Sequence, residues 1–219
     1  MMKTLNGIDV SKWQRDIDFV KVKNAGIDFV IIKAGGSDAG IYKDKYFEQN
    51  YKNAKAAGLN VGAYYFVGKK FLTEADGRAD AERFIKLLEG KQFEYPVYVD
   101  VETGAFKTRK QYTDATIAFC ATMEKAGYFC GVYASDISGF HDMLEDDRLK
   151  IYTHWVARYG SKPTFVSQAD IWQHSSKGVV DGILKYVDLD RCYVDFPKII
   201  KGKGFNGFKK PKKEKEGAK

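Results

Sequence analysis

Two acidic residues at the end of an apolar run, Asp100 and Glu102, are the residues of this sequence best suited to chemistry. The preceding residues 95–99 are typical of a β-strand, whose two-residue period points both side chains to the same side. Like charge and removal from water both oppose the second ionisation, so the two pKa values should separate. One acid can then donate a proton near neutral pH while the other stays anionic, as cleavage of a glycosidic bond requires.

An Asp-x-Glu pair alone is common, and solvated carboxylates at a strand end would look the same. Two further acids, Asp9 and Asp188, are expected at the ends of other strands, together with aromatic side chains that suit the flat faces of sugar rings. We therefore expect Glu102, Asp100, Asp9 and Asp188 to form a catalytic group. The side chains expected to contact a sugar are Tyr64, Phe66, Tyr133, Trp155, Trp172 and Gln173.

Positioning these residues requires a fold in which many strand ends meet. Short runs rich in Val, Ile, Tyr and Phe alternate with amphipathic stretches, which is typical of repeated βα units. Glycines 26, 58, 90 and 127 each follow a helix-like segment, where a left-handed residue ends a helix at little cost. The predicted strands are residues 7–10, 28–33, 60–67, 95–101, 129–133, 151–157, 170–173 and 186–189. The clearest predicted helices are residues 45–57, 74–88 and 113–125, with a weaker helical pattern over 138–144.

Eight strands with about five helices predict an α/β fold of the modified TIM-barrel type, because a complete (β/α)₈ barrel typically needs ~250 residues. In such a barrel the loops after the strands open around one shared mouth, where the reactive side chains gather. An open doubly wound sheet is the alternative. No Gly-rich phosphate-binding loop follows a strand, however, and Gly35-Gly36 is too short a signal.

Other reactive constellations are poorly represented. The three histidines, at positions 141, 154 and 174, form no closely spaced pair of ligands, and the sequence has no Cys-x-x-Cys motif to accompany them. Both absences argue against a zinc site. Cys120 and Cys130 fit small core residues better than nucleophiles, and no Gly-x-Ser-x-Gly motif is present. The acids could also hold a divalent cation. We expect neither a metal nor a cofactor.

The charge is concentrated at the C-terminal end. The formal net charge is +7, and residues 198–219 contain nine Lys and two Glu, so residues 1–197 are neutral overall. We expect residues 1–197 to form the catalytic barrel and the Lys-rich residues 198–219 to be a disordered tail. A nucleic-acid-binding domain would carry its positive charge on a folded face, so no nucleic-acid partner is expected unless the tail recruits one.

The sequence shows no run of the roughly 18 apolar residues that a membrane-spanning helix needs, and residues 1–6 do not resemble a secretion signal. The odd number of cysteines, three, excludes a fully paired disulfide framework. These features predict synthesis in the cytoplasm without a signal peptide.

A specific series of motifs, in a set order and spacing, occupies residues 7–14 with 17–19, 29–35, 43–47 with 50–58, 62–66, 98–102, 172–173 and 187–190. This series resembles the family 25 glycoside hydrolases, the N-acetylmuramidases that include many bacteriophage endolysins. The resemblance covers about residues 6–190. Within it, Tyr65 stands where many members carry His, and Asp190 where Asn is frequent.

The resemblance implies hydrolysis of the β-1,4 bond between N-acetylmuramic acid and N-acetylglucosamine in peptidoglycan. By position Glu102 is the general acid, Asp100 orients the substrate's acetamido group or acts as nucleophile, and Asp9 and Asp188 line the same cleft. Release to the cell wall would depend on a holin or on lysis, and the basic tail could bind anionic wall polymers. The alternative from another class is a catalytically silent glycan-binding module.

Overall fold

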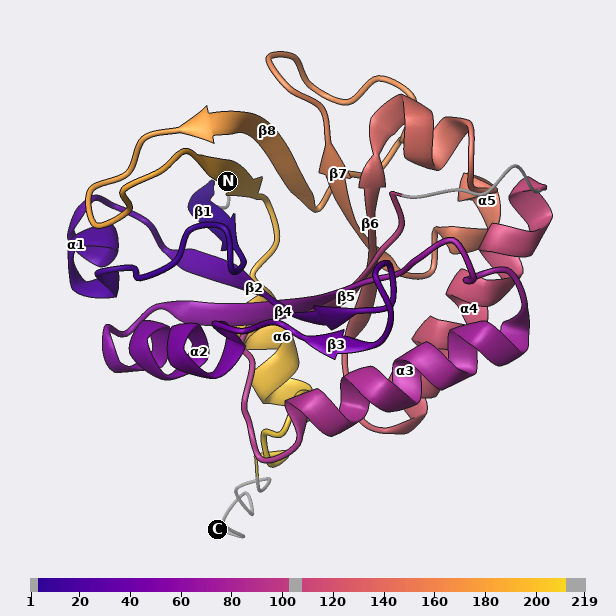
Figure 1. Cartoon of the computed structure of the whole chain (residues 1–219), viewed down its shortest axis with the longest axis horizontal. Helices are drawn as coiled ribbons and strands as arrows, with labels where there is room; N and C mark the ends of the chain where they lie inside the picture. The colour runs from indigo at the N-terminus through magenta and orange to yellow at the C-terminus, as the bar shows by residue number, and fades with distance from the viewer. Residues whose placement is uncertain (1–3, 103–107, 212–219) are drawn as a thin grey trace, which may run out of the picture.

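The strands form one sheet that closes on itself. In the computed structural model, which describes residues 4–102 and 108–211, the sheet order is β1-β9-β8-β7-β6-β5-β4-β2-β3, and β1 also pairs with β2 (Figure 1). Eight strands thus complete a barrel, and the short β3 extends from β2. The strands are β1 (Leu5–Val10), β2 (Phe29–Gly36), β3 (Tyr42–Lys43), β4 (Asn60–Phe66), β5 (Val97–Asp100), β6 (Cys130–Ser135), β7 (Thr153–Ala157), β8 (Ile171–Gly178) and β9 (Val187–Cys192).

All eight predicted strands are present, and they are not all parallel. The barrel strands from β1 to β8 pair in parallel, whereas β9 runs antiparallel to both of its neighbours, β8 and β1. The beginning of β9 therefore lies beside the ends of the parallel strands. Asp188 reaches the mouth of the barrel because it is the second residue of a reversed strand.

The helices lie mainly outside the barrel. Helix α2 packs against β2 and β4, α4 packs against β5 and β6, and α3 packs against α4 (Figure 1). Thr73 and Thr108 begin α3 and α4 with capping boxes, each formed with the residue three positions later. The helices are α1 (Phe19–Asn24), α2 (Phe47–Ala56), α3 (Glu74–Leu88), α4 (Arg109–Lys125), the π-helix η1 (Asp136–His141), α5 (Asp146–Leu149) and α6 (Phe196–Lys203).

The barrel interior and the layer under the helices are separate apolar clusters. Phe29, Tyr98 and Trp155 belong to the interior cluster, whereas Val30, Val99 and Val156 belong to the cluster under the helices. Adjacent residues of one strand thus alternate between the two clusters, as the pleat of a strand requires. The same alternation continues toward the mouth and decides which strand residues face the central cavity.

The left-handed helix ends predicted from the sequence are confirmed. Gly26, Gly58, Gly90 and Gly127 have φ between +73° and +87°, a region that residues with a Cβ rarely adopt. The weaker helical pattern over 138–144 corresponds to η1, a π-helix rather than an α-helix. The two short helices α5 and α6 were not predicted, so the barrel has more helical segments than the sequence indicated.

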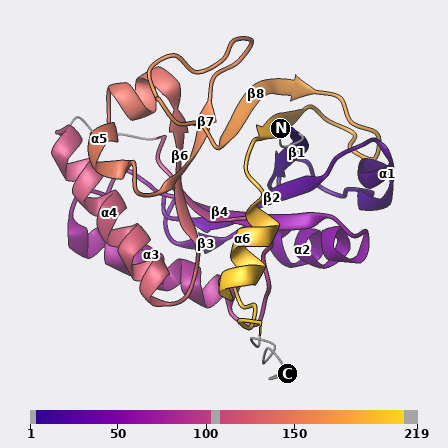
Figure 2. The same ribbon diagram turned by 180° about the vertical axis from the view of Figure 1, so that it is seen from behind.

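The expectation of a disordered tail from residue 198 is wrong for its described part. Residues 198–203 complete α6, which Asp195 caps and Gly204 ends, and Ile200 is fully buried. Phe196 contacts Tyr95 and Phe129 in the barrel interior, so α6 closes the end of the barrel away from the mouth (Figure 2). Residues 212–219 lie outside the described residues.

Asn206 attaches this C-terminal segment to the barrel. Its side-chain amide donates to the carbonyls of Phe93 and Tyr95 over 3.2 and 2.9 Å, and its Oδ1 accepts from the backbone N–H of Phe129 over 2.7 Å. The residue is completely buried. A charge count could not reveal this contact, because one polar residue supplies it inside a Lys-rich sequence.

Within residues 4–102 and 108–211, no helix combines the length and apolar character needed to cross a bilayer.

Candidate active site

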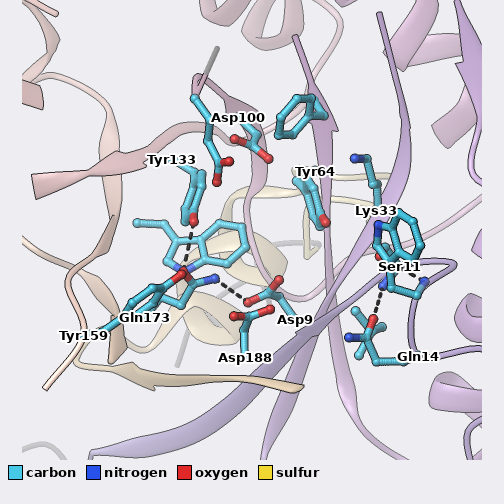
Figure 3. A pocket seen from close by; sticks show the side chains of 15 residues that line it. Asp9, Ser11, Gln14, Lys33, Tyr64, Asp100, Tyr133, Tyr159, Gln173 and Asp188 are labelled. Atoms are coloured by element: carbon cyan, nitrogen blue, oxygen red, sulfur yellow. Dashed lines mark hydrogen bonds between the residues drawn. The ribbon is translucent and has the colours of Figure 1, made fainter. Parts of the chain in front are cut away.

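Five carboxyl groups from three strands meet around the barrel mouth. Asp9 is the second-to-last residue of β1, and Asp100 is the last residue of β5. Glu102 follows Asp100 by two positions, and Asp188 and Asp190 belong to β9. All except Asp190 line one cavity of about 220 Å³, which we call the acidic pocket (Figure 3). The four acids predicted from the sequence are thus brought together. The other lining residues include Ser11, Trp13, Gln14, Lys33, Tyr64, Phe66, Tyr133, Trp155, Tyr159 and Gln173.

Asp9 and Asp188 lie side by side at the base of the acidic pocket. They are opposite each other in the β1–β9 pairing, and Figure 3 shows their carboxyl groups adjacent. Burial, followed by the charge of Asp188, raises the pKa of Asp9 well above its ordinary value. Burial and the charge of Glu102 raise the pKa of Asp188 to about 6. This part of the pocket therefore holds protons at pH values where exposed carboxyls are ionised.

Gln173 orients Asp9 through a chain of hydrogen bonds. Its Oε1 accepts from the hydroxyl of Tyr133 over 2.9 Å and from that of Tyr159 over 3.2 Å. Because two donors face this oxygen, the amide nitrogen must point the other way, where it donates to Oδ2 of Asp9 over 2.7 Å (Figure 3). Gln173 therefore makes Asp9 a hydrogen-bond acceptor and links it to Tyr133 and Tyr159.

Asp190 lies below the acidic pocket and was not among the predicted catalytic residues. Its Oδ1 accepts a hydrogen bond from Nε1 of Trp155 over 2.8 Å, and the residue is almost fully buried. Burial is the main cause that raises its pKa well above the ordinary value, and the charge of Asp188 adds to it. A neutral Asp190 supplies the same carbonyl-type acceptor to Trp155 that an asparagine would.

Asp100 and Glu102 differ chiefly in access to solvent. Asp100 is 3% exposed, and burial together with the charge of Glu102 raises its pKa well above the usual range. Glu102 is an exposed residue of the rim, yet its carboxyl lines the pocket, and burial by the surrounding protein raises its pKa as well. The Tyr133 hydroxyl nearby and the charge of Lys33 partly oppose that rise. Glu102 is thus an acid of raised pKa that a bound molecule can reach.

Lys33 was not predicted, although it lies on a predicted strand. Its ammonium lies 4.2 Å from the ring centre of Phe66 and 5.7 Å from that of Tyr64. Its positive charge lowers the pKa of both Asp100 and Glu102 against the larger effect of burial. The alternation along residues 28–33 could have placed Lys33 inward, because a charged residue in an apolar strand needs a polar surface to face.

Trp155 forms the base of the aromatic wall. Its ring lies 4.3 Å from that of Tyr133, 5.3 Å from that of Tyr98 and 5.9 Å from that of Tyr64, measured between ring centres. Tyr64 and Tyr133 continue this wall into the pocket. Because Trp155 itself is buried, it mainly supports Tyr64 and Tyr133.

Trp172 does not line the acidic pocket, contrary to the prediction. Gln173 faces inward, so the strand period turns its neighbour outward, where the Trp172 ring packs against His174 and Arg191. Its Nε1 donates to the carbonyl of Arg158 over 2.7 Å. Trp172 therefore supports the loop after β7 from outside.

The same loop brings Tyr159, also missed by the sequence analysis, to the pocket. Buried Asp136 accepts from the Arg158 guanidinium over 2.6 Å and from the backbone N–H groups of residues 164–166. Tyr159 lies between these anchored positions and points its hydroxyl at Gln173. No local pattern in residues 158–166 marks this role, because it depends on contacts with Asp136 of η1 and Gln173 of β8.

The arrangement can supply a proton and stabilise positive charge within one cavity. Glu102 offers an exchangeable proton at the rim, and the acids below it provide negative charge as they ionise. Aromatic faces border the cavity at Tyr64 and Tyr133. This combination fits acid-assisted cleavage of a bond between sugars.

Comparison with known proteins agrees with this chemistry. The chain is 29% identical over 187 residues to the autolytic lysozyme of Clostridium acetobutylicum, covering 85% of this chain and 55% of that protein, so it spans about half the length of this relative. The structure of the CTP1L endolysin superposes with a TM-score of 0.78 at 32% identity, over 92% of this chain and 70% of that one.

The modular autolysin LytC of Streptococcus pneumoniae, solved with a synthetic peptidoglycan ligand, gives a TM-score of 0.76 at 26% identity. That match covers 87% of this chain and 47% of LytC. The family model for glycosyl hydrolases family 25 matches residues 8–183, which include the end of β1 and strands β2 to β8 of the modified TIM barrel. The chain therefore belongs to glycosyl hydrolases family 25.

Proposed function

We propose that this protein is a peptidoglycan hydrolase that cleaves the β-1,4 bond between N-acetylmuramic acid and N-acetylglucosamine. The observation that carries the proposal is the position of Glu102, a solvent-reachable acid whose pKa is raised. It lies in one pocket with the buried Asp9 and Asp100 and the partly buried Asp188. Relatives described as lysozyme, endolysin and autolysin support the same reaction class. LytC, solved with a peptidoglycan ligand, supports the substrate class.

The proposed reaction starts with proton transfer from Glu102 to the glycosidic oxygen. The bond between that oxygen and the anomeric carbon then breaks, and the carboxylates below stabilise the positive charge that develops at this carbon. Either the acetamido carbonyl of the substrate, oriented by Asp100, or Asp100 itself attacks the anomeric carbon. Water, deprotonated by the Glu102 carboxylate, completes the hydrolysis and restores the acid.

The test is Glu102→Gln, which keeps the shape of the side chain and removes its proton. We expect release of reducing ends from purified cell walls to fall by ~10² or more with the fold unchanged, because general acid catalysis typically contributes 10²–10⁴-fold. Glu82→Gln, on the exposed surface of α3, is the matched control and should keep full activity. Retention of most activity by Glu102→Gln would refute the role of Glu102.

Mass analysis of the released fragments identifies the bond that is cut. Muramic acid at the new reducing end supports the proposal, whereas glucosamine there would make the protein a glucosaminidase. Binding to peptidoglycan with no fragment released would favour the catalytically silent glycan-binding module.

We further propose that the basic C-terminal segment holds the enzyme on anionic wall polymers. The lysines at positions 201, 203, 209 and 210 are all exposed, and four more follow in residues 212–219. Removing only residues 212–219 is the appropriate test, because deletion of all the basic residues from 201 onward would also remove buried Asn206. Wall binding should weaken mainly at low salt, with unchanged turnover of soluble fragments. Release through a holin or at lysis stays a prediction.

A further inference from the structure

A group of exposed apolar side chains borders the acidic pocket. Trp13, in the loop after β1, is 66% exposed, and the β8–β9 loop contributes Val179, Leu184 and Tyr186, which are 81%, 96% and 63% exposed. They line a hollow of about 480 Å³, which we call the β8–β9 groove. Single exposed apolar residues are ordinary, but several gathered in one hollow mark a binding surface.

The groove continues directly from the acidic pocket. Trp13 and Gln14 line both cavities. The Gln14 side chain accepts from the backbone N–H of Ser11 over 3.0 Å and donates to the carbonyl of Tyr186 over 3.3 Å. A second link joins the N–H of Asp18 to the carbonyl of Gly182 over 3.0 Å. The groove is therefore held at a fixed position relative to Asp9 and Asp188.

The acidic pocket also opens on its other side. A cavity of about 320 Å³ shares Glu102, Tyr133 and Tyr159 with it and adds the polar side chains of Ser138 and Arg158. The reactive acids thus lie between two hollows of different character, one with a mixed polar and apolar lining and one largely apolar. A site for a small, isolated sugar needs neither extension, whereas a polymer passing over Glu102 needs both.

We propose that the β8–β9 groove binds sugar units of the glycan strand beyond those that flank the cleaved bond. This inference rests on the proposed function, because it extends the same substrate. The rings of Trp13 and Tyr186 offer faces on which a sugar ring can stack. The ammonium of Lys12 lies 5.3 Å from the Trp13 ring centre, and Lys185 lines the groove, so both cations can meet acidic substituents of the strand.

The experiment compares one enzyme on long and short substrates. In the full chain, the double variant Leu184→Ser with Tyr186→Ala removes the apolar side of the groove and leaves the acidic pocket intact. With long uncrosslinked glycan strands we expect kcat/KM to fall about tenfold, through KM, which corresponds to ~1.4 kcal/mol. With tetrasaccharide fragments, too short to reach the groove, kcat/KM should stay within about twofold of the original protein.

Ile151→Ser is the matched control. Ile151 is 81% exposed and apolar, but it precedes β7 at the end of the barrel away from the mouth. This variant should cleave both substrates like the original protein. Equal losses on both substrates by the groove variant, or no loss on long strands, would overturn the groove assignment.

Two further outcomes are distinguishable. If the original protein releases no reducing ends from long strands, the proposed function itself fails, whatever the groove does. If sedimentation shows that the original protein is a dimer and the groove variant is a monomer, the groove is an interface between two copies and the sugar-binding assignment is overturned.

Discussion

The side-chain amide of Gln173 donates to Oδ2 of Asp9 over 2.7 Å, across 164 residues of sequence. This contact joins β8 to β1 at the point where the barrel surrounds the acidic pocket. The direction of the bond is fixed, because Tyr133 and Tyr159 occupy the other end of the amide. Asp9 therefore depends on Gln173 for its orientation and for part of the stabilisation of its anion.

Replacing Gln173 by Glu removes the amide N–H group that donates to Asp9 and puts a further carboxyl group beside it. We expect kcat to fall by about tenfold or more, because Asp9 loses a charge-assisted hydrogen bond and gains a repulsive neighbour. The measurement is the release of reducing ends at saturating substrate. Gln49→Glu is the control, since Gln49 also donates to an aspartate, Asp16, over 2.8 Å but on the exposed surface. Unchanged kcat in Gln173→Glu would contradict the positioning role.

Lys33 tunes the acids of the acidic pocket, so its removal should shift the pH profile. The Lys33 charge lowers the pKa of Glu102, and Lys33→Met therefore raises it. The basic limb of kcat/KM, where the proton donor is lost, should therefore move to higher pH. Lys43→Met, an exposed lysine paired with Glu48, should leave this limb in place. A downward shift in Lys33→Met would show that another group controls the limb.

Asp188 makes folding stability depend on pH. Its pKa is about 6 in the fold against an ordinary value of 3.8, so the folded state binds its proton more tightly than the unfolded state. Its favourable contribution is complete below pH 3.8 and is lost as the pH rises through 6. Asp188→Asn has no proton to lose and should gain roughly 2 kcal/mol relative to the original protein between pH 4 and 7, after allowance for solvent screening.

Denaturant unfolding at several pH values measures this difference. Asp181→Asn, on the exposed β8–β9 loop, is the control and should show no such pH-dependent gain. A gain for Asp188→Asn that shrinks as the pH rises would have the opposite sign and would refute the assignment.

Asn206 should be essential to the stability of the closed end of the barrel. Asn206→Ala leaves the carbonyls of Phe93 and Tyr95 and the N–H of Phe129 without their side-chain partner. We expect a loss of about 2–4 kcal/mol in the free energy of unfolding, because buried polar groups without partners are costly. Asn53→Ala, on the exposed surface of α2, should change stability by less than ~0.5 kcal/mol. Similar stability of both variants would contradict this role.

Local periodicity in the sequence was sufficient for the strands and for the acidic pair. The apolar run before Asp100 predicted β5, and the left-handed glycines at 26, 58, 90 and 127 marked the helix ends correctly. Trp172 shows the limit of this reasoning. Its place in a strand was predicted correctly, but β8 continues to Gly178, and the inward position there belongs to the neighbour Gln173.

The sequence by itself determined the β/α barrel pattern, because apolar runs alternate with amphipathic stretches along it. It also placed Asp100 and Glu102 on the same side, because the side chains of a strand repeat every two residues. The tertiary structure alone decided that reversed β9 brings Asp188 beside Asp9, that Lys33 and Tyr159 reach the pocket, and that Asn206 anchors the C-terminal segment. It also decided the raised pKa values, because burial and neighbouring charge arise only when residues distant in sequence surround the same carboxyl.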